Sequence, residues 1–295
     1  MLWGKDGLLV TDRCLSIFVK TPLSPQKGVM GVYWLPRFRG GSQKGRGNMH
    51  TLRMYWLFGV LVAMTSSATA GELDLQLESG GVWLTENDVR IPGDDGTQFD
   101  MLDLTGNGPD PYFRVYATYD FNDRHALRLT LAPLSVHGTG RLNEDVTFEN
   151  DIFAAGLPTK GTYTFNTYRL TYRWTFLDSQ RWRWGIGAAA LVRDAEITLE
   201  QGNKRQSRDD LGLVPLLHLY GEYRFNDQVS VIVDMEGAWS PMGRAVDAVL
   251  KAEYEFDSGW YVATGYRTLE GGADNDDVYT FAWLHYGVVT AGWRF

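Results

Sequence analysis

The sequence has 295 residues, of which 44% are hydrophobic, 22% are charged and one is cysteine. This composition excludes a collagen-like or wholly disordered chain, a disulfide scaffold and a metal fold held by several thiolates. Residues 1–70 hold nine basic and two acidic residues, whereas residues 71–295 hold 19 basic and 34 acidic residues, a net charge of −15. This negative excess argues against nucleic acid as a partner.

The front of the chain contains the parts of a secretory signal peptide. Residues 55–64 form an uncharged apolar run that is too short for a transmembrane helix. A short basic head with Arg53 precedes the run, and small residues ending in Ala68-x-Ala70 follow it. We therefore predict a signal peptide over residues 49–70, and we weigh a membrane anchor as the alternative.

Residues 1–48 precede this segment and show no sustained hydrophobic period. A signal peptide belongs at the start of a protein. We therefore interpret residues 1–48 as a non-native upstream extension, with the true start at Met49 or Met54.

The part expected to remain, residues 71–295, repeats one short ending: an aromatic residue, any residue and a phenylalanine. The endings are Tyr119 to Phe121, Trp174 to Phe176, Tyr223 to Phe225, Tyr254 to Phe256 and, at the last residue, Trp293 to Phe295. Turn residues follow the first four endings, and apolar residues alternate with polar ones on both sides of each turn. With a first strand near residues 73–77, this pattern predicts ten antiparallel strands.

The length of these strands indicates a membrane. The run 113–121 has nine residues, and a tilted strand needs about 9 to 11 to cross the hydrocarbon core. The connections on the other side are longer: 85–110, 138–161, 201–212 and 271–277. We predict an all-β, ten-stranded antiparallel up-and-down transmembrane β-barrel over residues 71–295, with a soluble β-sandwich as the alternative.

Two prolines interrupt the predicted strands. Pro133 and Pro215 lie within alternating runs, where proline removes a donor of the backbone ladder. We predict a bulge at each.

At this point the chain resembles the small, porin-like outer-membrane β-barrel proteins of Gram-negative bacteria. The last strand, 286–295, resembles the terminal assembly signal of that class, which ends in phenylalanine, here Phe295. The resemblance implies a location in the outer membrane of a Gram-negative bacterium, with membrane lipid and the outer-membrane assembly machinery as partners. It also implies a periplasmic aromatic girdle, formed by Tyr119, Phe121, Trp174, Phe176, Tyr223, Phe225, Tyr254, Phe256 and Trp293.

If the apolar positions face lipid, the alternate positions face the lumen, and their charges are unevenly distributed. The basic ones are Arg114, Arg128, Arg169, Arg173, Arg183 and Arg193; the acidic ones are Asp74, Glu78, Asp234, Glu236, Asp247, Glu253 and Glu255. In a ring of ten strands, the arginine wall faces the carboxylate wall. The charges either pair across the lumen and close it or leave a narrow wet path for a small polar solute.

Catalytic candidates are few. Asp123-Arg-His125 resembles an element of omptin-type surface proteases but lies in a turn on the periplasmic side. His218 shares a face with Glu222, and His137 could meet Asp209 or Asp210. We expect no catalytic residue and no cofactor; a hydrolase acting on lipid or peptide is the alternative.

The remaining candidates lie in the outer connections. The acidic cluster 274–277 could bind Ca²⁺ but lacks the spacing of a known calcium loop, so we expect no metal site. The two longest loops carry Phe99, Met101, Phe148 and Phe153, which we expect to be exposed for surface recognition or to cover the barrel mouth. The leading prediction is a non-catalytic barrel, mostly closed or narrowly conducting, that serves envelope integrity or small-solute passage.

Overall fold

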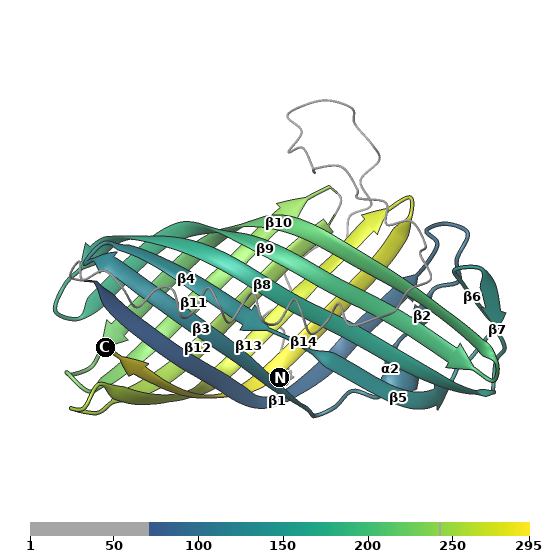
Figure 1. Cartoon of the computed structure of the whole chain (residues 1–295), viewed down its shortest axis with the longest axis horizontal. Helices are drawn as coiled ribbons and strands as arrows, with labels where there is room; N and C mark the ends of the chain where they lie inside the picture. The colour runs from purple at the N-terminus through teal and green to yellow at the C-terminus, as the bar shows by residue number, and fades with distance from the viewer. Residues whose placement is uncertain (1–70, 242) are drawn as a thin grey trace, which may run out of the picture. The chain divides into compact units, whose positions relative to one another are not determined.

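Alternating apolar and polar residues form long antiparallel strands in the computed structural model of the chain, which describes residues 71–241 and 243–295 (Figure 1). The predicted signal peptide and upstream extension lie outside the described residues. The elements are β1 (Glu72–Arg90), β2 (Phe99–Asp100), α2 (Leu102–Thr105), β3 (Asp110–Asn122), β4 (His125–Ala132), β5 (Ser135–Arg141), β6 (Val146–Phe148), β7 (Asp151–Phe153), β8 (Pro158–Asp178), β9 (Trp182–Gln201), β10 (Lys204–Arg224), β11 (Val229–Ser240), β12 (Gly243–Glu255), β13 (Trp260–Asn275) and β14 (Val278–Arg294). In this part of the chain, no helix is both long and apolar enough to cross a membrane.

Pairing between the first and last long strands closes the sheet into a barrel. The β1–β14 ladder runs from Asp74 opposite Arg294 to Arg90 opposite Tyr279. Strands β4 and β5 share one position in the ring, because both pair with β8. Ten strand positions result, which confirms the predicted ten-stranded antiparallel barrel.

The connections at the outer end differ from the prediction. The stretches 201–212 and 271–277, expected as loops, are mostly strand: β9 and β10 continue to a tight turn at Gly202, and β13 and β14 to a turn at residues 276–277. Gly202 has a φ of 58°, which glycine adopts without strain. The expectation failed because strands beyond the lipid meet water on both faces and lose the alternation of polarity while their backbone pairing continues.

The two prolines have different consequences. Pro133 separates β4 from β5, but the pairing with β8 keeps the same register on both sides of it, so the structure has a strand break there and not the predicted bulge. Pro215 lies inside β10 opposite Ala190, and the β9–β10 register has no shift at this point, so the bulge predicted at Pro215 is wrong.

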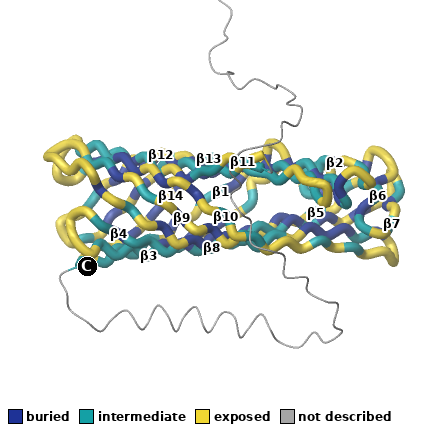
Figure 2. The backbone as a smooth tube through the Cα atoms, turned by 90° about the horizontal axis from the view of Figure 1, so that it is seen from above, coloured by how far each residue is buried: buried dark blue, intermediate teal, exposed yellow. Residues whose placement is uncertain are grey.

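Aromatic side chains mark both edges of the lipid-facing band. At the end with the short turns, each of the five endings forms a pair of contacting rings, such as Tyr119 with Phe121 and Trp174 with Phe176. At the other edge, Trp83, Trp239 and Tyr266 are exposed. Along the strands, buried and exposed residues alternate (Figure 2). Two such girdles around an apolar band are typical of outer-membrane barrels.

The two long outer loops fold into the barrel and fill its outer half. Phe99, Met101, Phe148 and Phe153 are all buried in one apolar cluster with inward residues such as Leu84. The expectation that they are exposed is wrong, whereas the alternative that these loops cover the mouth agrees with the structure. We call the loop residues of this cluster the apolar plug.

Glycines on two strands make room for the plug. Gly138 of β5 faces the α2 turn, and a Cβ there would lie 2.5 Å from the carbonyl oxygen of Leu104. A Cβ added at Gly161 of β8 would lie 2.8 Å from side-chain atoms of both Leu104 and Met101. Interior packing leaves no space for an added methyl group at such sites.

The lipid-facing register can be tested at Leu170, which is exposed on the outer face of β8 between Leu129 and Ala190. We expect Leu170→Arg to lower the free energy of unfolding in lipid vesicles by about 2–4 kcal/mol. The control is Leu157→Arg, which changes an equally exposed leucine at the tip of the outer loops and should cost less than about 0.5 kcal/mol. Equal costs for the two variants would contradict the register.

Candidate functional site

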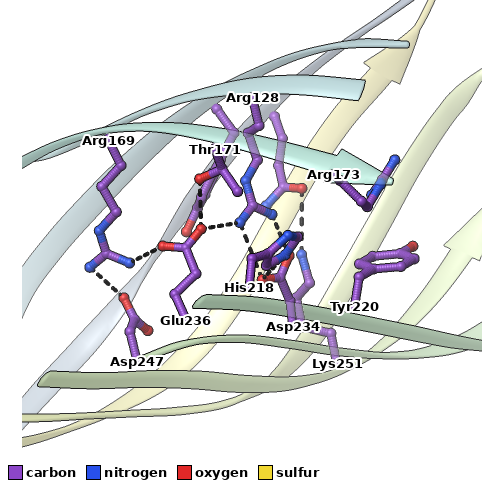
Figure 3. A network of polar contacts seen from close by, with 12 residues as sticks. Arg128, Arg169, Thr171, Arg173, His218, Tyr220, Asp234, Glu236, Asp247 and Lys251 are labelled. Atoms are coloured by element: carbon purple, nitrogen blue, oxygen red, sulfur yellow. Dashed lines mark hydrogen bonds and ion pairs between the residues drawn. The ribbon is translucent and has the colours of Figure 1, made fainter. Parts of the chain in front are cut away.

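Strand alternation directs one set of side chains from every strand into the lumen, and the charged ones meet across it. Eight of them form what we call the central network: the carboxylates Glu78, Asp234, Glu236 and Asp247, and the arginines Arg114, Arg128, Arg169 and Arg267. They come from seven strands, and none of their side chains is more than 17% exposed. The pairs of Arg114 with Asp247 and of Arg128 with Asp234 join opposite walls of the ring, β3 with β12 and β4 with β11. Figure 3 shows Arg128 and Arg169 reaching from one wall toward Asp234, Glu236 and Asp247 on the other.

Asp247 on β12 lies at the centre of the network. Its carboxylate accepts hydrogen bonds from Arg114 (2.9 Å) and Arg267 (2.6 Å) and forms an ion pair with Arg169 (2.6 Å). Glu236 binds Arg169 at 2.8 Å and Arg128 at 2.9 Å. Each of these two carboxylates therefore contacts more than one guanidinium, and together they connect the four strands that carry the arginines.

Arg267 on β13 closes the network against β1. Its guanidinium donates two parallel hydrogen bonds to Glu78, both at 3.0 Å. It also donates to the hydroxyl of Tyr116 (2.9 Å), which in turn donates to Glu78 (3.3 Å). Bidentate pairs of this kind are the strongest ionic contacts in proteins.

The other predicted lumen charges pair closer to the two ends. Arg173 binds Asp120 at 3.1 Å, Arg183 binds Asp178 at 3.0 Å, and Arg193 pairs with Asp210 outside the central network. Glu253 binds Arg294 at 2.7 Å and Glu255 pairs with the same guanidinium, whereas Asp74 accepts a hydrogen bond from Tyr261 at 2.6 Å. Arg183 and Arg193 thus pair with carboxylates of neighbouring strands and not with the central network.

Sequence reasoning missed four cations of the lumen: Arg224, Lys251, Arg267 and Arg294. Arg267 lies on β13, where the alternation from Trp260 to Leu269 is the least regular. Arg267 is an even number of residues from the buried Tyr261 on the same strand, so both side chains point to the same face, and this spacing could have revealed that Arg267 is a lumen residue. Lys251 follows the inward parity of Asp247 on β12, and its ammonium group lies 3.4 Å from Gln76.

A polar cavity of about 270 Å³ lies between the network and the end with the short turns. Nine acidic and nine basic side chains line it, from the central network to Arg183, Arg224 and Glu255 beside the turns. The lining is therefore balanced in charge. It suits water or a small zwitterion better than a strongly charged ion.

The histidines do not form the arrangements considered from the sequence. His218 is buried and contacts Asp234 at 3.2 Å, whereas Glu222 binds Arg224 and Tyr220. His218, Asp234 and Glu236 lie close enough together to hold a cation, but Arg128 already binds both carboxylates. A metal ion would have to displace that guanidinium.

The surface histidines are equally separate from acidic partners. His137 is exposed on β5, and the Asp210 considered as its partner pairs with Arg193. His125 contacts the hydroxyl of Tyr172 at 2.7 Å beside a periplasmic turn.

The acidic cluster at 274–277 forms the turn between β13 and β14, and hydrogen bonds within the cluster stabilise this turn. The side chain of Asn275 accepts hydrogen bonds from the backbone N–H groups of Asp277 (3.0 Å) and Val278 (3.1 Å). Nearby on the outer rim, burial together with the Asp100 carboxylate raises the pKa values of Asp88 and Asp103. The rim is therefore crowded with negative charge.

The ten closed strands, the apolar band and the two girdles make this a transmembrane β-barrel of the outer-membrane type.

Comparison with known proteins adds solved structures of the same class. No protein-family model matches the chain, and no curated protein matches it. Among solved structures, it is similar to the outer membrane protease OmpT from Escherichia coli, with 11% identity and a TM-score of 0.49 over 79% of this chain and 99% of that chain. It is also similar to Ail, the attachment invasion locus protein of Yersinia pestis, with 10% identity and a TM-score of 0.37 over 77% of this chain and 100% of that chain. A third similar structure is the toluene transporter TodX of Pseudomonas putida, with 10% identity and a TM-score of 0.31 over 77% of this chain and 90% of that chain. At this similarity, no activity, substrate or partner transfers to the chain.

The central network can be tested at Asp247. We expect Asp247→Ala to lower the free energy of unfolding by about 3–5 kcal/mol, because three buried arginines lose a shared carboxylate. The matched control is Asp210→Ala, which removes the partly exposed pair with Arg193 and should cost less than about 1 kcal/mol. Denaturant titration of both variants in vesicles measures the difference, and a small cost at Asp247 would show that the network does not support the barrel.

Proposed function

We propose that the chain is a sealed, non-catalytic outer-membrane barrel that serves envelope integrity. One observation carries the proposal: the central network joins opposite walls with ion pairs whose members are almost fully buried. Each guanidinium is held by more than one acceptor, so opening a path through the network would separate several pairs in a water-poor interior. Separating buried pairs in this way is costly.

The apolar plug supports the same proposal from the other end. Phe148, Phe153 and Met101 fill the outer half of the lumen, next to Leu84 and Leu284 of the wall. Ions cross an apolar constriction poorly because it does not stay wet. The lumen thus has an ionic closure in its middle and an apolar closure outside it.

The pairing of the lumen side chains favours a non-catalytic role. A nucleophilic site needs a hydroxyl or thiol beside a base. The hydroxyl of Thr171, which points at the network, donates to Glu236 at 2.7 Å, and His218 contacts Asp234. These groups hold one another in place.

Conductance is the direct test of sealing. Reconstituted in a planar bilayer, the protein should give no unitary current steps at moderate voltage, because both closures block ions. A general porin reconstituted in parallel is the positive control. Regular steps whose size rises with salt concentration would refute a sealed lumen.

A second candidate function is the passage of a small polar solute, and the charge-balanced cavity of about 270 Å³ favours it. The two candidates differ in a swelling assay with vesicles that contain the protein. Swelling in glycine or another small zwitterion, without ionic current, would support the second candidate over the first.

The hydrolase and surface-recognition alternatives have weaker support. A lipid or peptide hydrolysis assay tests the first, with His137→Ala and His218→Ala as variants; activity lost in either one would overturn the non-catalytic proposal. Recognition by the outer loops would depend on Ile152 and Leu157, which remain exposed when the aromatic residues enter the plug.

Assembly is expected to depend on the last residue. The N–H of Phe295 donates to the carbonyl oxygen of Leu73 at 2.9 Å, at the seam where the barrel closes. We propose that the outer-membrane assembly machinery reads this terminus, so deletion of Phe295 should reduce the folded yield in cells. Substitution of Phe225, an equally exposed girdle phenylalanine, by alanine is the control, and an equal yield for both variants would contradict a terminal signal.

A further inference from the structure

The ladder between β10 and β11 stops inside the lipid-facing band. Strand β10 pairs with β9 from Lys204 to Tyr223 but with β11 only from Leu217 to Arg224. Strand β11 continues to Ser240 alongside β12. Residues 211–216 of β10 and 238–240 of β11 therefore form an interrupted junction, which we call the lateral seam.

Pro215 explains where the ladder stops. The N–H of Arg224 donates to Arg181 on the β9 side, and the N–H of Phe225 donates to Val229 on the β11 side. Successive residues of a strand direct their backbone groups to opposite neighbours, so the odd-numbered residues of β10 face β11. Pro215 therefore presents a ring nitrogen without hydrogen to the seam, where β11 would need a donor.

The height of the seam is set by the aromatic girdles. Eleven residues separate Tyr223 in the periplasmic girdle from Leu213, counting both, which is about the length that crosses the hydrocarbon core. Trp239 and Arg244 face each other at the tip of the β11–β12 hairpin, and aromatic and basic residues collect where hydrocarbon meets headgroups. The seam lies at their level, in the outer leaflet.

Both faces of the seam are apolar. Outside, Leu211, Trp239 and the adjoining Leu217 are 66%, 79% and 76% exposed. Inside, a second apolar cluster, separate from the plug, covers the wall of a lumen that is otherwise charged; it consists of Ala189, Leu191 and Leu216, with Val214, Ala238 and Ala245 packed against them. A hydrocarbon chain at the edge of this cluster would therefore meet apolar side chains and no charged one.

We propose that the lateral seam binds the hydrocarbon chain of an outer-leaflet lipid, with the chain lying against the partly buried Val214 at the edge of the cluster that contains Leu191 and Leu216. This inference goes beyond the sealed-barrel function and does not depend on it. A β-strand of another protein fits less well, because proline at an open strand edge opposes pairing with a further strand. The missing N–H of Pro215 also removes a donor that hydrocarbon could not satisfy.

Site-directed spin labelling tests the proposal. Residues 71–295 contain no cysteine, so the full chain with Cys14→Ser accepts single labels at Val214→Cys (inward, at the seam), Leu213→Cys (outward) and Thr118→Cys (inward, in the polar cavity). In phosphatidylcholine and phosphatidylglycerol vesicles, oxygen reports contact with hydrocarbon and a nickel chelate reports contact with water. We expect the oxygen-to-nickel accessibility ratio at residue 214 to match that at 213 and to exceed that at 118 about tenfold, because apolar oxygen concentrates in hydrocarbon.

Other results would overturn the proposal. A ratio at residue 214 like that at 118 would mean water in the seam, and low accessibility to both reagents would mean closed protein packing. Low oxygen access at both 213 and 214, with dipolar broadening between labels, would mean pairing with a second copy of the chain.

A filled variant controls for the route. Ala238→Trp occupies the inward side of the seam and should lower oxygen access at residue 214 while leaving residue 213 unchanged. If access at 214 does not fall, the chain does not enter between β10 and β11, and the proposal fails.

Discussion

Charge neutrality inside a closed wall is the constraint on which this barrel depends. Lipid forces backbone groups to pair around the ring, with the lateral seam as the exception, and this pairing directs half of the side chains into a narrow lumen. There each guanidinium must find a carboxylate, because an unpaired charge in such an interior is expensive. Four arginines and four carboxylates from seven strands meet this demand together, with Asp247 shared by three of the arginines.

The interior has two halves with different physical character. Ion pairs hold the middle, and their direction and spacing connect strands that are far apart in sequence, such as Arg114 with Asp247. The outer half is held by the apolar plug, whose burial is non-directional and depends on close packing against glycines such as Gly138. The two closures rely on different forces, which supports the proposed sealed state.

Period-two alternation predicted the strand count, the closure of the ring and the lipid-facing side of residues such as Leu170, because the bilayer imposes this pattern on every spanning strand. It could not predict the long β8–β10 extension, where water contacts both faces, or the burial of Phe99 and Phe148, which depends on how loops fold back. For the charged residues, alternation predicted which side chains point into the lumen but not which of them pair. Arg267 lies in a run with irregular alternation, so its pair with Glu78 was not predicted. His218 contacts Asp234 of the next strand and not Glu222, which is nearer along the chain. Which charged side chains pair across the ring depends on the stagger between strands, and the sequence of a single strand does not determine that stagger.

The unequal heights of the strands have a consequence for neighbours in the membrane. Strands β8, β9 and β10 rise well beyond the short β11–β12 hairpin, so the wall is tall on one side and low on the other (Figure 1). Saccharide chains of the cell surface would meet a protein screen from one direction and only lipid from the other. In a crowded outer membrane, an adjacent protein would therefore contact a tall wall or a low wall, depending on the side of the barrel on which it lies.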